Sequence, residues 1–162
     1  MPTPPPSALD PRTTGIILVD HGSKKSAAND MLFDVAALFR RVSGFAIVEP
    51  AHMELADPTI AQAFDACVAH GATTVIVHPY FLSPGRHSTT DIPRLTQEAA
   101  AKHPHVRYHV TPPLGLDDKI AQVILQRIAH CGDASFDCPT CSDTACRDTR
   151  AQAAARIAHP SH

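Results

Sequence analysis

The sequence has no tryptophan, and aromatic residues make up 5% of its 162 residues. A surface that stacks nucleic-acid bases needs such rings, so base binding is not expected. The sequence also has no large excess of positive or negative charge. The formal net charge is −2 with histidine neutral, and this offers no basic surface to a polyanion. No apolar run approaches the ~20 residues that span a bilayer, so no membrane partner is expected.

The N-terminus lacks both the basic and the apolar region of a secretory signal. It begins Met1-Pro2-Thr3-Pro4-Pro5-Pro6, and we expect residues 1–14 to form a disordered, proline-rich lead-in. A transit peptide would need several arginines, and this segment carries Arg12 alone.

The middle of the chain alternates short β-branched runs with amphipathic helical patterns. The predicted strands are 15–19, 45–48, 73–77 and 106–110. The predicted helices are 27–42, a second beginning at the N-cap Asp57, a third beginning at the cap Asp91 and a fourth after Asp117. This order predicts an α/β fold with a parallel sheet between helical layers. In a flavodoxin-like strand order, 2-1-3-4, the ligand-binding switch point lies between the first and third strands.

The helical period also predicts which side chains face the core. In the first helix these are Met31, Leu32, Val35, Leu38, Phe39 and Val42, and in the fourth they are Ile120, Val123, Ile124 and Ile128.

Two histidines follow the strands that flank the switch point. His21 comes directly after the first strand, and His87 lies in the loop after the third. Imidazole both binds borderline metals and accepts protons near neutral pH, so these two are candidate metal ligands and bases. The alternative for each is a loop histidine that bonds local carbonyl groups.

Two carboxylates, Glu49 and Glu54, follow the second strand. We take Glu54 as a candidate catalytic group that receives protons or metal. A solvated acid in the first helical turn is the competing interpretation.

Cations and hydroxyls surround the same loops. Any one of these cations is more often a solvated surface charge than a ligand. The candidates for holding an acidic substrate are Lys24 and Arg86, with the hydroxyls of Ser23 and Ser88, and Lys25 and Arg94 lie nearby.

The remaining histidines lack a placement at the switch point, and we expect most of them to be surface or packing residues. They are His52, His70, His78, His103, His105, His109, His130, His159 and His162. His78 is the exception, because it lies at a strand end and stays a candidate functional residue.

The cysteines fall into two groups. Cys67 lies on the apolar face of the second helix and is expected to be a small buried residue. The other four follow the spacing C-x6-C-x2-C-x4-C in a polar segment: Cys131, Cys138, Cys141 and Cys146. Four thiols can complete a zinc or an iron–sulfur site, and spacing does not separate the two. The alternatives are a pair of disulfides or thiols without a role, and the missing secretion signal disfavours disulfides.

Four motifs, in order along the chain, resemble the small class II chelatases, and most closely their plant and cyanobacterial sirohydrochlorin ferrochelatases. They are Leu18-Val19-Asp20-His21-Gly22-Ser23, Glu49-Pro50-Ala51-His52-Met53-Glu54-Leu55-Ala56-Asp57-Pro58, Pro79-Tyr80-Phe81-Leu82-Ser83-Pro84-Gly85-Arg86-His87 with Asp91-Ile92-Pro93, and Pro112-Pro113-Leu114-Gly115. The likeness runs from about Gly15 to Cys146.

The resemblance implies a chelatase-like three-layer αβα sandwich, with residues 15–130 as the chelatase domain. It implies insertion of Fe²⁺ into sirohydrochlorin to form siroheme, with His21 and His87 as the active-site and metal-binding histidines. It associates the cysteine segment 131–146 with a [2Fe–2S] cluster, for which Cys131 is the natural fourth ligand. The tail 147–162 lies outside the likeness.

Small members of this family pair as homodimers, so a homodimer is expected, with sirohydrochlorin and a divalent metal as its partners. The expected location is cytoplasmic, or plastid if the source is a plant or alga. Two other functions stay open: cobalt or nickel insertion into sirohydrochlorin, and a non-enzymatic metal or tetrapyrrole carrier or redox sensor.

Overall fold

The structure is a computed structural model that describes residues 9–133. Within these residues, 9–116 form one compact unit, and 117–133 belong to a second. The first unit contains β1 (Thr14–Asp20), α1 (Ser26–Ser43), β2 (Ile47–His52), α2 (Ile60–Ala69), β3 (Thr74–Pro79), the π-helical turn η1 (His87–Asp91), α3 (Ile92–Ala100) and β4 (Arg107–Val110). The second contains α4 (Asp118–Asp133).

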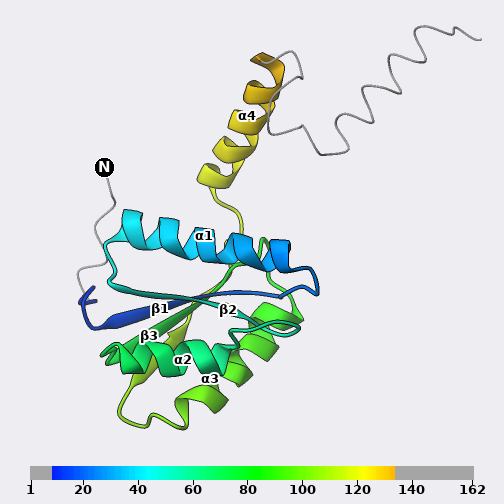
Figure 1. The fold of residues 1–162 in the computed structure, drawn as a ribbon. Helices are drawn as coiled ribbons and strands as arrows, with labels where there is room; N and C mark the ends of the chain where they lie inside the picture. The colour runs from blue at the N-terminus through cyan, green and yellow to red at the C-terminus, as the bar shows by residue number, and fades with distance from the viewer. Residues whose placement is uncertain (1–8, 134–162) are drawn as a thin grey trace, which may run out of the picture. The chain divides into compact units, whose positions relative to one another are not determined.

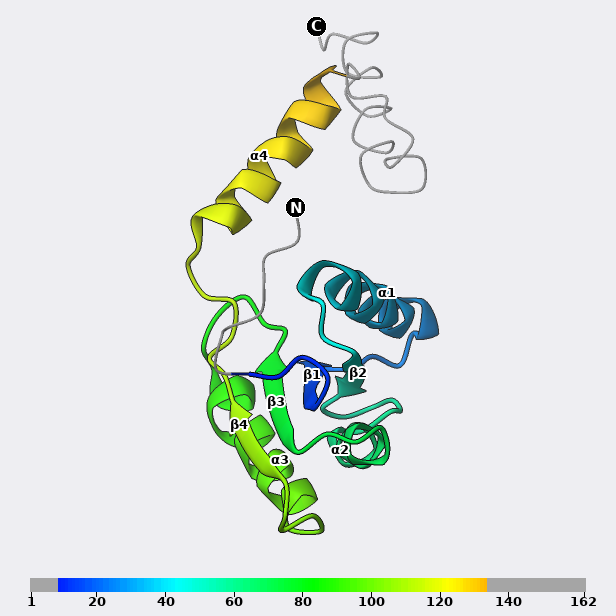
Figure 2. The same ribbon diagram turned by 90° about the vertical axis from the view of Figure 1, so that its left-hand side faces the viewer.

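The four strands form one parallel sheet in the order β2-β1-β3-β4. α1 covers one face of the sheet, and α2 and α3 cover the other (Figures 1 and 2). The predicted α/β sandwich and its strand order are therefore confirmed. None of the helices within residues 9–133 has the length and apolar character needed to cross a membrane.

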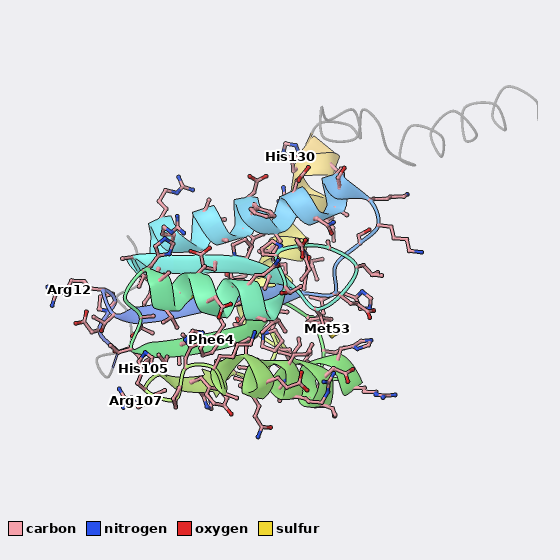
Figure 3. All side chains as sticks on the ribbon, turned by 60° about the horizontal axis from the view of Figure 1, so that its bottom comes forward. Arg12, Met53, Phe64, His105, Arg107 and His130 are labelled. Atoms are coloured by element: carbon pink, nitrogen blue, oxygen red, sulfur yellow. The ribbon has the colours of Figure 1, made fainter. Side chains whose placement is uncertain are left out.

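β1 lies at the centre of the sheet and is buried on both faces. Ile17 and Val19 pack in the cluster beneath α2 and α3, around the fully buried Phe64 (Figure 3). Ile16 and Leu18 pack in the opposite cluster, beneath α1. Burial of this apolar surface is the main favourable contribution to folding of the unit.

β2 differs most from its predicted range. It runs from Ile47 to His52, whereas the sequence predicts a strand that ends before Pro50. Pro50 pairs in register with Leu18 of β1. A proline is tolerated here because β2 is an edge strand, with no strand on its outer side to accept a hydrogen bond.

Two helix starts also differ from prediction. Thr59, not Asp57, caps α2, because its hydroxyl accepts the Gln62 amide while the Gln62 side chain accepts the Thr59 amide. Asp91 makes no capping hydrogen bond to α3. It ends η1, a helical turn in the segment predicted to be loop.

Some side chains expected in the core are exposed. α1 turns Leu32 and Ala36 toward the sheet, so Met31, Leu38 and Val42 lie outside that stripe and are exposed. In α4, taken by itself, Val123, Ile124 and Ile128 are exposed.

The folded unit begins before residue 14, the predicted end of the disordered lead-in. The Thr14 amide donates to the Asp10 carbonyl and the Ala46 amide to the Pro11 carbonyl, and Thr14 is already buried in β1. Residues 10–14 are therefore part of the folded unit.

The loops after β1 and β2 approach each other very closely. Gly22 has φ +84°, and a Cβ added there would lie 2.0 Å from the carbonyl oxygen of Glu54 and 3.1 Å from the Cβ of His52. Gly44 has a similar φ of +78°, but nothing lies within 4 Å of a Cβ there. Only Gly22 thus combines the backbone need for glycine with a steric one.

We predict that Gly22→Ala lowers the free energy of unfolding by about 2 kcal/mol more than Gly44→Ala. Both variants place a side chain at positive φ, which costs roughly 1–2 kcal/mol, and Gly22→Ala must also push the two loops apart. Urea unfolding of both variants measures the difference. Equal losses would show that the loops have room to relax.

Candidate active site

The carboxyl ends of β2, β1 and β3 lie side by side, because β1 is hydrogen-bonded to both neighbours in parallel. His21 follows β1, Glu54 follows β2, and His87 begins η1 after β3. Met53, beside Glu54, marks this end of the sheet in Figure 3, and Arg12, His105 and Arg107 mark the opposite end. Topology alone thus brings together residues that are far apart in sequence.

The two switch-point histidines lie next to each other. The ring centroids of His21 and His87 are 5.1 Å apart, with an interplanar angle of 80°. Both side chains are nearly half exposed, so a ligand can reach them.

Both nitrogens of His21 face oxygen atoms. Nε2 lies 2.9 Å from Oε1 of Glu54, and Nδ1 lies 3.2 Å from the carbonyl oxygen of Gly22. A ring that donates from both nitrogens is the protonated form. Each ring nitrogen thus has an oxygen acceptor beside it, and Glu54 lies next to His21 at the strand ends, while its catalytic role stays a prediction.

His87 has a different arrangement. Its Nδ1 lies 2.9 Å from Oδ2 of Asp91, four residues later on the same helical turn. When Nδ1–H donates to this carboxylate, the lone pair is on Nε2, which makes no hydrogen bond within residues 9–133. A carboxylate behind an imidazole is a common way to orient a metal ligand. Sequence reasoning missed Asp91, although its i, i+4 spacing from His87 was visible.

The predicted substrate-binding residues differ in accessibility. Lys24 and Arg86 are exposed beside the histidine loops. The Ser23 hydroxyl accepts the Lys25 amide. Ser88 is buried, and its hydroxyl accepts the Gly85 amide and donates to the Gly85 carbonyl. The structure thus favours a loop-closing role for Ser88 over substrate contact.

Glu49 is not part of this group. Its Oε1 lies 3.4 Å from Nδ1 of His70. Its charge adds to burial in raising the pKa of the Cys67 thiol to about 12, with burial as the larger cause. Cys67 is fully buried, as expected of a small packing residue.

His78 lines an apolar groove of about 410 Å³ on the α1 side of the sheet, with Leu18, Phe39 and Ile76 among its walls. Its Nδ1 lies 2.7 Å from the Thr111 hydroxyl, and burial lowers the pKa of His78. The neutral ring is therefore favoured, and His78 is a packing residue of the groove.

His52 is the second residue that sequence reasoning missed. It is completely buried at the end of β2, and its Nδ1 lies 2.6 Å from Oδ1 of Asp20, at the end of β1. The expectation of a surface or packing histidine is too simple, because the ring pairs with a carboxylate beside His21.

Of the four predicted cluster ligands, Cys131 alone lies within the described residues. It is a partly exposed free thiol near the end of α4. Cys138, Cys141 and Cys146 lie outside the described residues. Among residues 9–133 no group of three or more histidine, cysteine or acidic side chains is arranged to hold a metal ion.

Comparison with known proteins adds three relatives. The chloroplastic sirohydrochlorin ferrochelatase of Arabidopsis thaliana is 47% identical over 135 residues, which cover 80% of this chain and 60% of the relative. The sirohydrochlorin cobaltochelatase of Sulfurisphaera tokodaii is 32% identical over 114 residues, 70% of this chain and 90% of the relative. The sirohydrochlorin chelatase SirB of Bacillus subtilis subspecies spizizenii, solved with cobalt, superposes with a TM-score of 0.69 at 29% identity, over 73% of this chain and 50% of that chain.

The chain thus spans about 60% of the plant relative and half of SirB, but most of the archaeal relative. The CbiX family model matches residues 15–131, from the second residue of β1 to beyond β4, and both switch-point histidines lie within the match. This match covers most of the chain, and the chain belongs to the CbiX family.

Proposed function

We propose that this protein inserts Fe²⁺ into sirohydrochlorin to form siroheme. The observation that carries the proposal is the pair His21 and His87, 5.1 Å apart at the carboxyl edge of the sheet, each beside a carboxylate. The identity with a sirohydrochlorin ferrochelatase supports the choice of substrate and metal.

Metal insertion requires a ligand for the incoming ion. Neutral imidazole binds divalent iron, cobalt and nickel. Asp91 holds the Nδ1 proton of His87 and leaves the Nε2 lone pair for the metal. His87 is thus the group that receives Fe²⁺ as it sheds water.

The reaction must also remove the protons of two pyrrole N–H groups. His21 accepts a proton at Nε2 and shares it with Glu54, whose carboxylate is half exposed and can pass the proton to solvent. His21 therefore acts as the base, and the exposed Lys24 and Arg86 hold carboxylates of the macrocycle.

A second candidate is cobalt or nickel insertion by the same residues. The cobaltochelatase name of one relative and the cobalt in the SirB structure favour cobalt. Steady-state metalation of sirohydrochlorin with each ion decides between these candidates. A protein that binds the macrocycle or metal without turnover would instead be a carrier or sensor.

We predict that His21→Ala lowers kcat for metalation about 100-fold or more, as expected for the loss of one positioned acid–base group. His87→Ala should lower it at least as much, because it removes the proposed ligand for the incoming metal. Asp91→Asn lowers it about tenfold, as expected for a group that orients a metal ligand. His70→Ala is the matched control, because His70 also lies near a carboxylate but outside the site. Wild-type rates in His87→Ala would remove the site assignment.

We further propose that the active form is a homodimer. A ligand site usually encloses most of its ligand, and one α/β unit offers a tetrapyrrole a single wall. A second copy, related by two-fold symmetry, supplies the other wall.

Light scattering at micromolar concentration should report twice the mass of the chain. Dilution below the dissociation constant should lower specific activity in step with the dimer fraction. A monomer with full specific activity would rule out this arrangement.

We also propose that Cys131, Cys138, Cys141 and Cys146 bind a [2Fe–2S] cluster in segment 131–146. The support is the four-thiol spacing, together with a free, partly exposed Cys131 thiol in the described residues. When bound, the cluster supplies one-electron chemistry, which metal insertion does not use.

If the source is a plant or alga, the chloroplastic relative supports a plastid location.

Protein purified without oxygen should be brown and contain about two irons per bound cluster. Replacing the four thiols by serine should remove the colour and leave metalation unchanged, because His21 and His87 belong to the other unit. Colourless anaerobic protein that holds one zinc per chain would instead assign a structural zinc site.

A further inference from the structure

A buried pair lies directly behind the proposed base. Asp20 ends β1 and His52 ends β2, and the two residues are partners in the parallel register of these strands. His52 has no exposed surface, and its Nδ1 lies 2.6 Å from Oδ1 of Asp20. Neither side chain has a part in the mechanism above.

The contacts favour one position for the proton between them. Oδ1 of Asp20 also accepts the Gly22 amide at 2.9 Å. When Asp20 is ionised, Oδ1 accepts in both contacts, and Nδ1 of His52 carries the proton and donates it. Nε2 of His52 is buried and has no hydrogen-bond partner within the described residues.

The pair lies where the two site loops join. The Met53 amide donates to the Asp20 carbonyl at 2.9 Å, and the Glu54 amide donates to the His21 carbonyl at 3.1 Å. The His52–Asp20 contact continues this series through side chains. It connects the strand end before His21 to the strand end before Glu54.

We propose that Asp20 and His52 are a positioning pair that holds the His21 loop against the Glu54 loop. Through this contact they set the 2.9 Å approach of His21 Nε2 to Glu54 Oε1. The proposal rests on the proposed function, and it adds two residues that act through others and do not touch substrate.

Two substitutions of His52 separate this role from packing. His52→Asn keeps an N–H donor near the position of Nδ1 and removes Nε2. His52→Leu keeps the apolar volume and removes the donor. We expect kcat for metalation to fall about tenfold or more in His52→Leu and to stay within about threefold in His52→Asn, with KM for sirohydrochlorin little changed in both.

The chain offers a matched control. Nε2 of His103 lies 2.6 Å from Oδ1 of Asp65, an equally short contact between α2 and the segment after α3. His103→Leu should leave kcat unchanged, even where it lowers the melting temperature. If His52→Leu and His103→Leu affect kcat equally, or if neither does, the positioning role is wrong.

Amide hydrogen exchange gives a second readout that does not depend on turnover. Exchange at Gly22 and Glu54 should accelerate in His52→Leu and remain near wild type in His52→Asn. Nitrogen NMR of the wild type should find His52 with its proton on Nδ1. A proton on Nε2 instead, or unchanged exchange in His52→Leu, would overturn the proposal.

Variants of Asp20, the partner of His52, provide the same comparison if His52→Leu does not fold. Asp20→Asn keeps the oxygen that accepts both N–H groups, and Asp20→Leu removes it. Retained kcat in the first and loss in the second supports the pair, and equal kcat in both contradicts it. A wild type without metalation would refute the proposed function, while hydrogen exchange would still decide the positioning role.

Discussion

The parallel pairing of β1 with a strand on each side is the constraint on which the site depends. It aligns three carboxyl ends and places the chain after each strand at one edge of the sheet. His21, Glu54 and His87 lie far apart in the sequence and still meet at that edge. The buried apolar residues of β1 supply the free energy that keeps this arrangement in place.

The fold follows from local patterns that are visible in the sequence. Four β-branched runs separated by helical periods allow few topologies other than an open parallel sheet, and the strand order matches the predicted one. The errors are local. Pro50 lies inside β2 because an edge strand tolerates it, which depends on a neighbour that sequence does not show.

The site was predictable where it depends on strand ends, and not where it depends on register. His21 and His87 follow strands and could be selected on that ground. The contact between His52 and Asp20 exists because these two residues are partners across the β1–β2 pairing, and no local pattern encodes this pairing. Asp91 was predicted to be a cap because aspartate before a helical segment usually caps it. In the structure a π-helical turn precedes α3, and the Asp91 carboxylate lies beside His87.

The central claim is that the two histidine loops form one site for a divalent metal. The most direct measurement is a Co²⁺ titration followed by NMR, in protein whose four cysteines of segment 131–146 (Cys131, Cys138, Cys141 and Cys146) are replaced by serine. Co²⁺ binds imidazole and broadens the signals of nearby protons. The account predicts that the ring signals of His21 and His87 broaden first and together. Early broadening at His70 or His103, with His21 and His87 unchanged, would contradict it.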